Sequence, residues 1–149
     1  MRNDEKVLFE HVQRVGSKFV ALEKGLVFRY RGTNLYASEI HLMKTVDYNP
    51  DVNASGMAKL LGVTKGAVSQ TVSRLVQKGV IVKERDPSCN NELKISLTSF
   101  GKGALTAFHT QNGSQWKDFI NYLESLPGED YQIVIGFLAK MEAFLDSLR

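Results

Sequence analysis

The sequence has few of the features that mark secreted, membrane or disordered chains. Cys89 is the single cysteine among 149 residues, so no internal disulfide can form, which agrees with a reducing compartment. Only 3 prolines are present, and no apolar run approaches the ~20 residues that cross a bilayer. The first residues are polar and lack the apolar core of a signal peptide. We therefore expect a globular, cytoplasmic protein with no membrane partner.

Catalytic and metal-binding patterns are also scarce. His11, His41 and His109 are far apart in the sequence and lie in no cluster of metal-ligating residue types. The chain has no Ser-His-Asp pattern, no phosphate-binding loop and no pair of acids in a suggestive context. An enzyme is therefore the poorest hypothesis, and we expect neither a cofactor nor a metal ion.

Positive charge is concentrated in the middle of the chain. The formal net charge is only +3, but residues 53–85 carry six positive side chains against the one carboxylate of Glu84. No carboxylate occurs between Asp51 and Glu84. A basic segment on a slightly acidic body suits a surface that binds phosphates. The alternative is that these lysines only contact water on an exposed face.

Apolar spacing predicts a mainly α chain with a small β-hairpin. Leucines and valines at spacings of three and four indicate long amphipathic helices at both ends, and an alternating segment indicates a strand. Ser38 and Thr98 are the expected N-caps of the second and fifth helices. The expected elements are helices over about 4–30, 38–47, 54–61, 65–78, 99–125 and 129–148, and strands near 80–82 and 93–97.

Residues 57–72 meet the demands of a helix-turn-helix. Ala58 is small enough for close helix packing, Gly62 tolerates a positive φ in the turn, and Thr64 can cap the second helix. Val63 follows the turn glycine and is expected to point inward. The outer face of the second helix carries polar groups of the kinds that read base edges or grip phosphates. An ordinary helical hairpin with a polar surface is the alternative.

These features, in this order, resemble the MarR family of transcriptional regulators. The motifs that carry the resemblance are Leu75-Val76-Gln77-Lys78-Gly79-Val80-Ile81, then Asp86-Pro87, then Ile95-Ser96-Leu97-Thr98 followed by Gly101. The resemblance covers nearly the whole chain in element order and residues 55–101 in motif. It implies a winged helix-turn-helix core flanked by N- and C-terminal dimerisation helices.

The resemblance implies one MarR-like chain over residues 1–149. Residues 36–98 are expected to form the winged helix-turn-helix DNA-binding region, and residues 1–35 and 99–149 the helical dimerisation region. The alternative is that the two terminal apolar stripes pack within one monomer. The residues expected in the dimer interface are Leu8, Val12, Val15, Val134, Leu138, Met141 and Leu145.

The implied function is that of a sequence-specific, DNA-binding transcriptional regulator. As a homodimer it would bind a pseudo-palindromic operator in double-stranded DNA, with repression as the expected mode. The alternative is a winged-helix protein-interaction module with weak or no DNA binding. The residues expected at the DNA are Ser55, Thr64, Lys65, Gly66, Ala67, Ser69, Gln70, Ser73, Arg74, Lys78, Lys83, Arg85, Asn90, Asn91 and Lys94.

The expected wing departs from the family's pattern at its tip. Where the family usually carries an aspartate and two arginines after Asp-Pro, this chain has Cys89, Asn90 and Asn91. The arginine that normally enters the minor groove is therefore missing, while the basic residue before the wing is retained as Lys83.

The resemblance also implies a candidate effector, a small aromatic or phenolic molecule bound between the dimerisation and DNA-binding regions. Its binding would change the spacing of the two recognition helices. Aromatic side chains at helical spacing are more often core than pocket, so a purely structural role is the alternative. The expected wall residues are Phe28, Tyr30, Tyr36, His41 and Met43.

Overall fold

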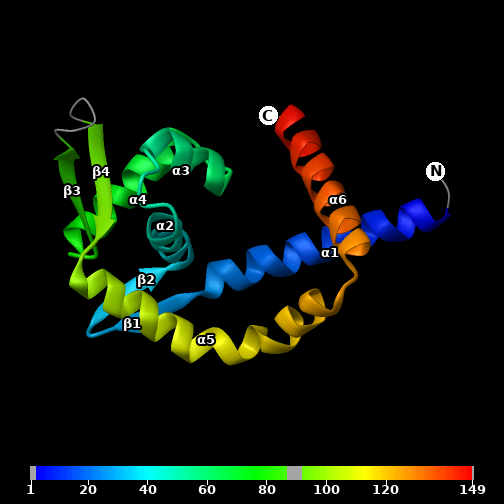
Figure 1. Cartoon of the computed structure of the whole chain (residues 1–149), viewed down its shortest axis with the longest axis horizontal. Helices are drawn as coiled ribbons and strands as arrows, with labels where there is room; N and C mark the ends of the chain where they lie inside the picture. The colour runs from blue at the N-terminus through cyan, green and yellow to red at the C-terminus, as the bar shows by residue number, and fades with distance from the viewer. Residues whose placement is uncertain (1–2, 87–91, 149) are drawn as a thin grey trace. The chain divides into compact units, whose positions relative to one another are not determined.

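The computed structural model describes residues 3–86 and 92–148, most of which are helical (Figure 1). The strands form two antiparallel pairs, β1 with β2 and β3 with β4. The predicted mainly α fold with a β-hairpin is confirmed, and a second hairpin accompanies it. In chain order the elements are α1 (Asn3–Gly25), β1 (Val27–Tyr30), β2 (Thr33–Tyr36), α2 (Ala37–Tyr48), α3 (Ala54–Leu61), α4 (Lys65–Gln77), β3 (Ile81–Asp86), β4 (Glu92–Leu97), α5 (Ser99–Ser125) and α6 (Gly128–Ser147).

The first predicted helix is too long, because its last residues form a strand. α1 ends at Gly25, and Phe28 and Tyr30 lie in β1. Arg31 and Gly32 connect β1 to β2 with φ values of 43° and 86°. Two successive positive φ values are what a tight two-residue hairpin turn requires, and they exclude a continuous helix.

α2 begins earlier than predicted. Its N-cap is Tyr36 rather than Ser38, and the Glu39 carboxylate accepts the backbone N–H of Tyr36 at 3.0 Å. The first N–H groups of a helix have no partner within the helix, so a glutamate at the third helical position stabilises this earlier start.

The chain divides into two compact units, one ending at Phe108 and one beginning at His109. In the first unit α4 contacts α2, α3 and β3. In the second unit, α6 buries none of its side chains. No described helix is long and apolar enough to cross a bilayer. The most deeply buried apolar side chains of the first unit include Leu35, Ile40, Leu42, Met43, Met57, Val68, Val72, Leu75 and Val80.

The start of α5 is held against Val80, which follows α4 and precedes β3, by a backbone hydrogen bond and a close approach. Thr98 caps α5 as predicted, because its Oγ1 accepts the N–H of Gly101 at 3.0 Å. The backbone N–H of Thr98 donates to the carbonyl oxygen of Val80 at 3.0 Å. A Cβ on Gly101 would overlap that same carbonyl group. The Leu-Thr-x-x-Gly motif therefore combines a helix cap with a close approach that only glycine permits.

We expect Gly101→Ala to lower the free energy of unfolding by about 1–3 kcal/mol, because the added methyl group forces α5 away from Val80. Thermal unfolding followed by circular dichroism measures this loss. Gly113→Ala is the matched control in the same helix, since a Cβ there meets nothing within 4 Å. The control should keep or raise the midpoint, because alanine favours helix over glycine. Equal midpoints for both variants would contradict the close approach.

Candidate nucleic-acid interface

α3 and α4 form a helix-turn-helix whose turn has the predicted geometry. Gly62 adopts φ 63° and ψ 29°, the left-handed conformation that glycine tolerates. The Val63 N–H donates to the carbonyl oxygen of Ala58 at 3.0 Å, which closes the end of α3. Ala58 itself is buried, with 6% of its surface exposed. The predicted roles of Gly62 and Ala58 are confirmed.

The prediction that Val63 points into the core is wrong. It is 43% exposed. The chain reverses at Gly62, and Val63 becomes part of the wall of a surface pocket together with Leu42 and Leu61. The core beneath the turn is filled by Met57 and Val68, each 1% exposed.

α4 has one buried face and one exposed face. Thr64 caps the helix as predicted, and its Oγ1 accepts the Ala67 N–H at 3.2 Å. Val68, Val72 and Leu75 are buried on the inner side. Thr71 lies beside them and is also buried, at 7% exposure, so the remaining polar side chains of the helix face outward.

The outward face of the helix-turn-helix gathers most of the residues predicted to contact DNA. Neither α3 nor α4 contains an aspartate or glutamate. A surface without carboxylates does not repel the phosphate backbone. The exposure of these residues makes them available to DNA, and the contacts themselves stay a prediction. The exposed members are Ser55, Thr64, Lys65, Gly66, Ala67, Ser69, Gln70, Ser73 and Arg74.

β3 and β4 form the predicted wing. Ile81 lies opposite Leu97, and both side chains are buried, which seals the base of the hairpin. Lys83 is exposed. Lys94 is also exposed, and its ammonium lies 3.5 Å from the carboxylate of Asp51. The charge of Lys94 is therefore partly balanced by an acid that precedes α3.

Three predicted DNA contacts of the wing are not placed by the structure. The backbone of Arg85 lies in β3. Its side chain, together with Asn90 and Asn91, lies outside the described residues, so these contacts stay predictions. The unusual tip of the wing, including Cys89, is likewise outside them.

A buried carboxylate lies behind the C-terminal end of α4. Glu39 is 0% exposed, and both of its oxygens accept hydrogen bonds from Lys78 Nζ at 2.7 Å. Lys78 Nζ also donates to the carbonyl oxygen of Asn34 at 2.8 Å. Arg74 Nε lies 3.8 Å from a Glu39 oxygen. The phosphate contact predicted for Lys78 therefore competes with three contacts inside the protein.

Sequence reasoning missed Glu39, because it searched for carboxylates within the helix-turn-helix alone. Glu39 belongs to α2 and reaches α4 only through the tertiary fold. The available signal was a glutamate beside Ile40, Leu42 and Met43, all of which are 1% exposed. A charged residue that accompanies a buried apolar run usually has a buried partner.

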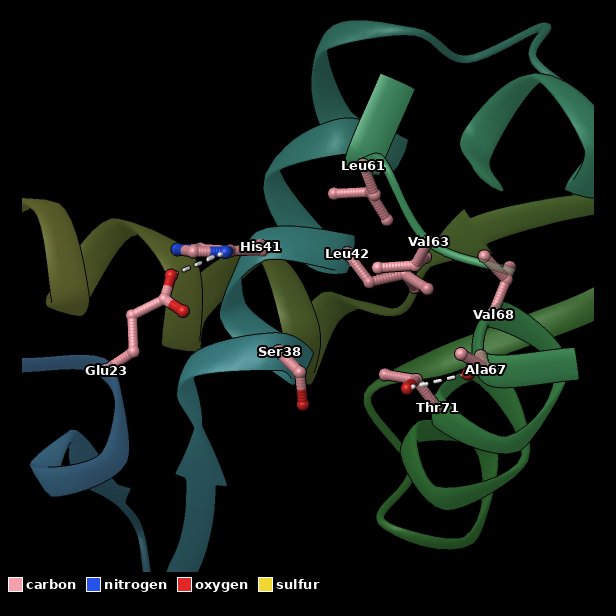
Figure 2. A pocket seen from close by; sticks show the side chains of 9 residues that line it. All are labelled: Glu23, Ser38, His41, Leu42, Leu61, Val63, Ala67, Val68 and Thr71. Carbon is pink, nitrogen blue, oxygen red and sulfur yellow. Dashed lines mark hydrogen bonds and ion pairs between the residues drawn. The ribbon is translucent and has the colours of Figure 1, made fainter. Parts of the chain in front are cut away.

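A pocket of about 260 Å³ lies between α2 and the helix-turn-helix (Figure 2). Its apolar wall includes Leu42, Leu61 and Val63. At its polar side, His41 Nδ1 lies 3.4 Å from the Glu23 carboxylate. Within residues 3–86 and 92–148, no three His, Cys, Asp or Glu side chains gather closely enough to hold a metal ion.

Only one of the residues predicted to line an effector site lies on this pocket, namely His41. Phe28 and Met43 are core residues, 7% and 1% exposed. Tyr30 packs against the ring of Phe100, with 5.3 Å between the ring centres. Tyr36 is the N-cap of α2. Most of the predicted wall therefore has a structural role.

The residues predicted at the dimer interface lie on α1 and α6, and neither helix buries any of its described side chains. Five of the seven are exposed: Leu8 50%, Val15 63%, Val134 42%, Leu138 50% and Leu145 54%. Val12 and Met141 are half-buried. An apolar surface of this extent is typical of an interface.

The central segment of the chain is similar to known proteins. The MarR family model matches residues 35–88, which run from β2 into the wing. The matched segment is less than half of the chain. YvnA of Bacillus subtilis (strain 168), an uncharacterised HTH-type transcriptional regulator, is 30% identical over 74 residues, which are 50% of this chain and 46% of YvnA. The chain therefore matches less than half of the length of YvnA.

Solved structures match the central segment together with the helices that flank it. FabT from Streptococcus pneumoniae, in complex with DNA, is 20% identical with a TM-score of 0.66, covering 97% of this chain and 99% of FabT. MepR from S. aureus, also in complex with DNA, is 19% identical with a TM-score of 0.56, covering 97% of this chain and 93% of MepR. At these identities the likeness establishes the fold, which confirms the predicted winged helix-turn-helix.

We expect Thr64→Ala to lower the free energy of unfolding by about 1 kcal/mol, because the Ala67 N–H loses its side-chain acceptor. Urea unfolding measures this loss. Thr64→Ser keeps a hydroxyl at the cap and should match the parent protein. If the alanine and serine variants are equally stable, Thr64 does not stabilise α4 as a cap.

Proposed function

We propose that this chain is a DNA-binding transcriptional regulator that places α4 in the major groove of double-stranded DNA. The observation that carries the proposal is the exposed, polar, carboxylate-free face of α4, opposite a buried apolar face. Arginine, glutamine and serine on such a face can hydrogen-bond to base edges, and lysines can bind phosphates. The DNA complexes of FabT and MepR, which share the fold, support this assignment.

The proposed interface has two parts. The helix-turn-helix would read bases mainly through Gln70 and Arg74, with Lys65 on a phosphate near the N-terminus of α4. The positive end of the helix dipole also favours a phosphate there. The wing would add backbone contacts. Apart from Lys78, which is set aside because of its internal contacts, the proposed surface comprises Ser55, Thr64, Lys65, Gly66, Ala67, Ser69, Gln70, Ser73, Arg74, Lys83, Arg85, Asn90, Asn91 and Lys94.

The apolar faces of α1 and α6 support a homodimer. Leu8 and Val15 on α1, and Leu138 and Leu145 on α6, are exposed apolar side chains that water solvates poorly. A two-fold dimer would present two copies of α4 to successive major grooves, about 34 Å apart, and would bind a pseudo-palindromic operator. Repression is the expected mode, because a dimer seated on an operator blocks other proteins.

We place the effector of this regulator in the pocket beside His41. Its apolar wall suits an aromatic ring, and its imidazole and hydroxyl groups suit a phenolic oxygen. Ala67 lines the pocket and also lies on the proposed DNA surface. An effector bound there would disturb the start of α4 and weaken operator binding.

Selection of bound duplexes from a random pool at low ionic strength tests the function directly. A homodimeric regulator should enrich a sequence with two-fold symmetry, and the enriched duplex then serves as the specific site in later measurements. A winged-helix module that contacts only proteins would enrich no sequence, and this outcome would overturn the proposal.

We expect Arg74→Ala to weaken binding to the selected duplex by about 1–3 kcal/mol, because a base-contacting arginine is lost. Fluorescence anisotropy at constant salt measures the change in Kd. Arg29→Ala is the matched control, since Arg29 is an exposed arginine on β1, outside the proposed surface. Unchanged binding by the Arg74 variant would remove this residue from the interface.

We expect Leu138→Lys to raise the dissociation constant of the dimer at least about tenfold, a change of ~1.4 kcal/mol, because it places an unpaired charge in an apolar interface. Analytical ultracentrifugation measures this constant. Tyr48→Lys is the control, because Tyr48 is 67% exposed at the end of α2, outside the predicted interface. A parent protein that stays monomeric would contradict the homodimer.

A further inference from the structure

Lys78 is a cation at the edge of the proposed DNA surface whose hydrogen-bonding capacity is used inside the protein. An ammonium group has three N–H donors. Lys78 Nζ has three protein acceptors, the two carboxylate oxygens of Glu39 at 2.7 Å and the carbonyl oxygen of Asn34 at 2.8 Å. It also lies 4.9 Å from the centre of the Tyr36 ring. To bind a phosphate, Lys78 would have to give up one of these contacts.

Glu39 reaches Arg74 as well, one helical turn earlier in α4. Arg74 Nε lies 3.8 Å from Glu39 Oε1, and Arg74 Nη2 donates to Thr71 Oγ1 at 2.9 Å. The Arg74 side chain remains 50% exposed. The guanidinium is therefore held on its inner side by Glu39 and Thr71, while its outer side faces the solvent that DNA would displace.

The carboxylate of Glu39 is held firmly enough to act on both cations. It is buried at 0% exposure, and its Oε2 accepts the backbone N–H of Tyr36 at 3.0 Å. A buried carboxylate that accepts several hydrogen bonds keeps one orientation. It therefore sets where the cations at the C-terminal end of α4 lie.

We propose that Glu39 is a specificity-determining positioning residue for DNA binding, which rests on the function proposed above. Glu39 keeps Lys78 away from the phosphates and holds Arg74 in one orientation for base contact. Phosphate contacts strengthen binding to every sequence, whereas base contacts distinguish one sequence from another. Because Glu39 keeps Lys78 from the phosphates and orients Arg74 toward the bases, it raises the ratio of specific to non-specific affinity for DNA.

The test compares Glu39→Gln with the parent protein on the selected duplex and on a scrambled duplex, over a series of salt concentrations. Glutamine keeps the shape and an acceptor for the Tyr36 N–H, but it loses the charge. We expect the ratio of the two affinities to fall about tenfold, the scale of one lost base contact. The salt dependence on the scrambled duplex should steepen by up to about 0.9 in log–log slope, because Lys78 is released to a phosphate.

A double variant tests Lys78 separately and covers the case in which Glu39→Gln fails to fold. Lys78→Met alone would leave the Glu39 charge buried without its partner, so Glu39→Gln/Lys78→Met removes both charges together. The double variant should keep the parent's salt slope, whereas Lys65→Met should reduce it by about 0.9, as expected for one lost phosphate contact. Circular dichroism shows which variants are folded.

Three outcomes would overturn the assignment. An unchanged affinity ratio and slope for a folded Glu39→Gln variant removes the role of Glu39. A slope that falls by about 0.9 in the double variant shows that Lys78 does bind a phosphate. If the parent protein binds neither duplex at low salt, the proposed function itself fails, and the role of Glu39 fails with it.

Discussion

The burial of one face of α4 is the constraint on which the rest of the arrangement depends. Val68, Val72 and Leu75 are 1%, 2% and 0% exposed, and the helix contacts α2, α3 and β3. Burial of each such side chain stabilises the fold by about 1.5–3 kcal/mol. Rotation of α4 about its axis would expose this apolar face, so the polar side chains opposite it have to face the solvent. The proposed DNA surface is thus a consequence of core packing.

Charge in the folded chain differs from charge counted along the sequence. The basic segment contains no acid between Asp51 and Glu84, yet two carboxylates approach its surroundings from outside that stretch. Glu39 of α2 binds Lys78, and Asp51 lies beside Lys94 of the wing. Lys65 of α4 and Lys83 of β3 are exposed. A contact surface is better judged from these local pairs than from net charge.

Most predictions that depended on nearby residues were confirmed, with the N-cap of α2 as an exception, and those that depended on distant packing were less accurate. The roles of Gly62, Thr64 and Thr98 follow from the backbone within three or four residues, and the structure shows each of them. The hairpin after α1 was missed because Tyr30 follows Leu26 at a spacing of four and so continues the apolar pattern of a helix. Val63 was expected in the core, but the space beneath the turn is occupied by other side chains, so it lines a pocket.

The amino-acid sequence by itself determined the N-caps of α4 and α5, the turn at Gly62, which face of α4 is apolar and which family the central segment resembles. These properties follow from side-chain chemistry acting on the adjacent backbone. The tertiary structure alone decided that Glu39 meets Lys78 and that His41 lines a pocket while Phe28 and Met43 are buried. Such partners come from separate elements, and their distances depend on how those elements pack, which no local pattern encodes.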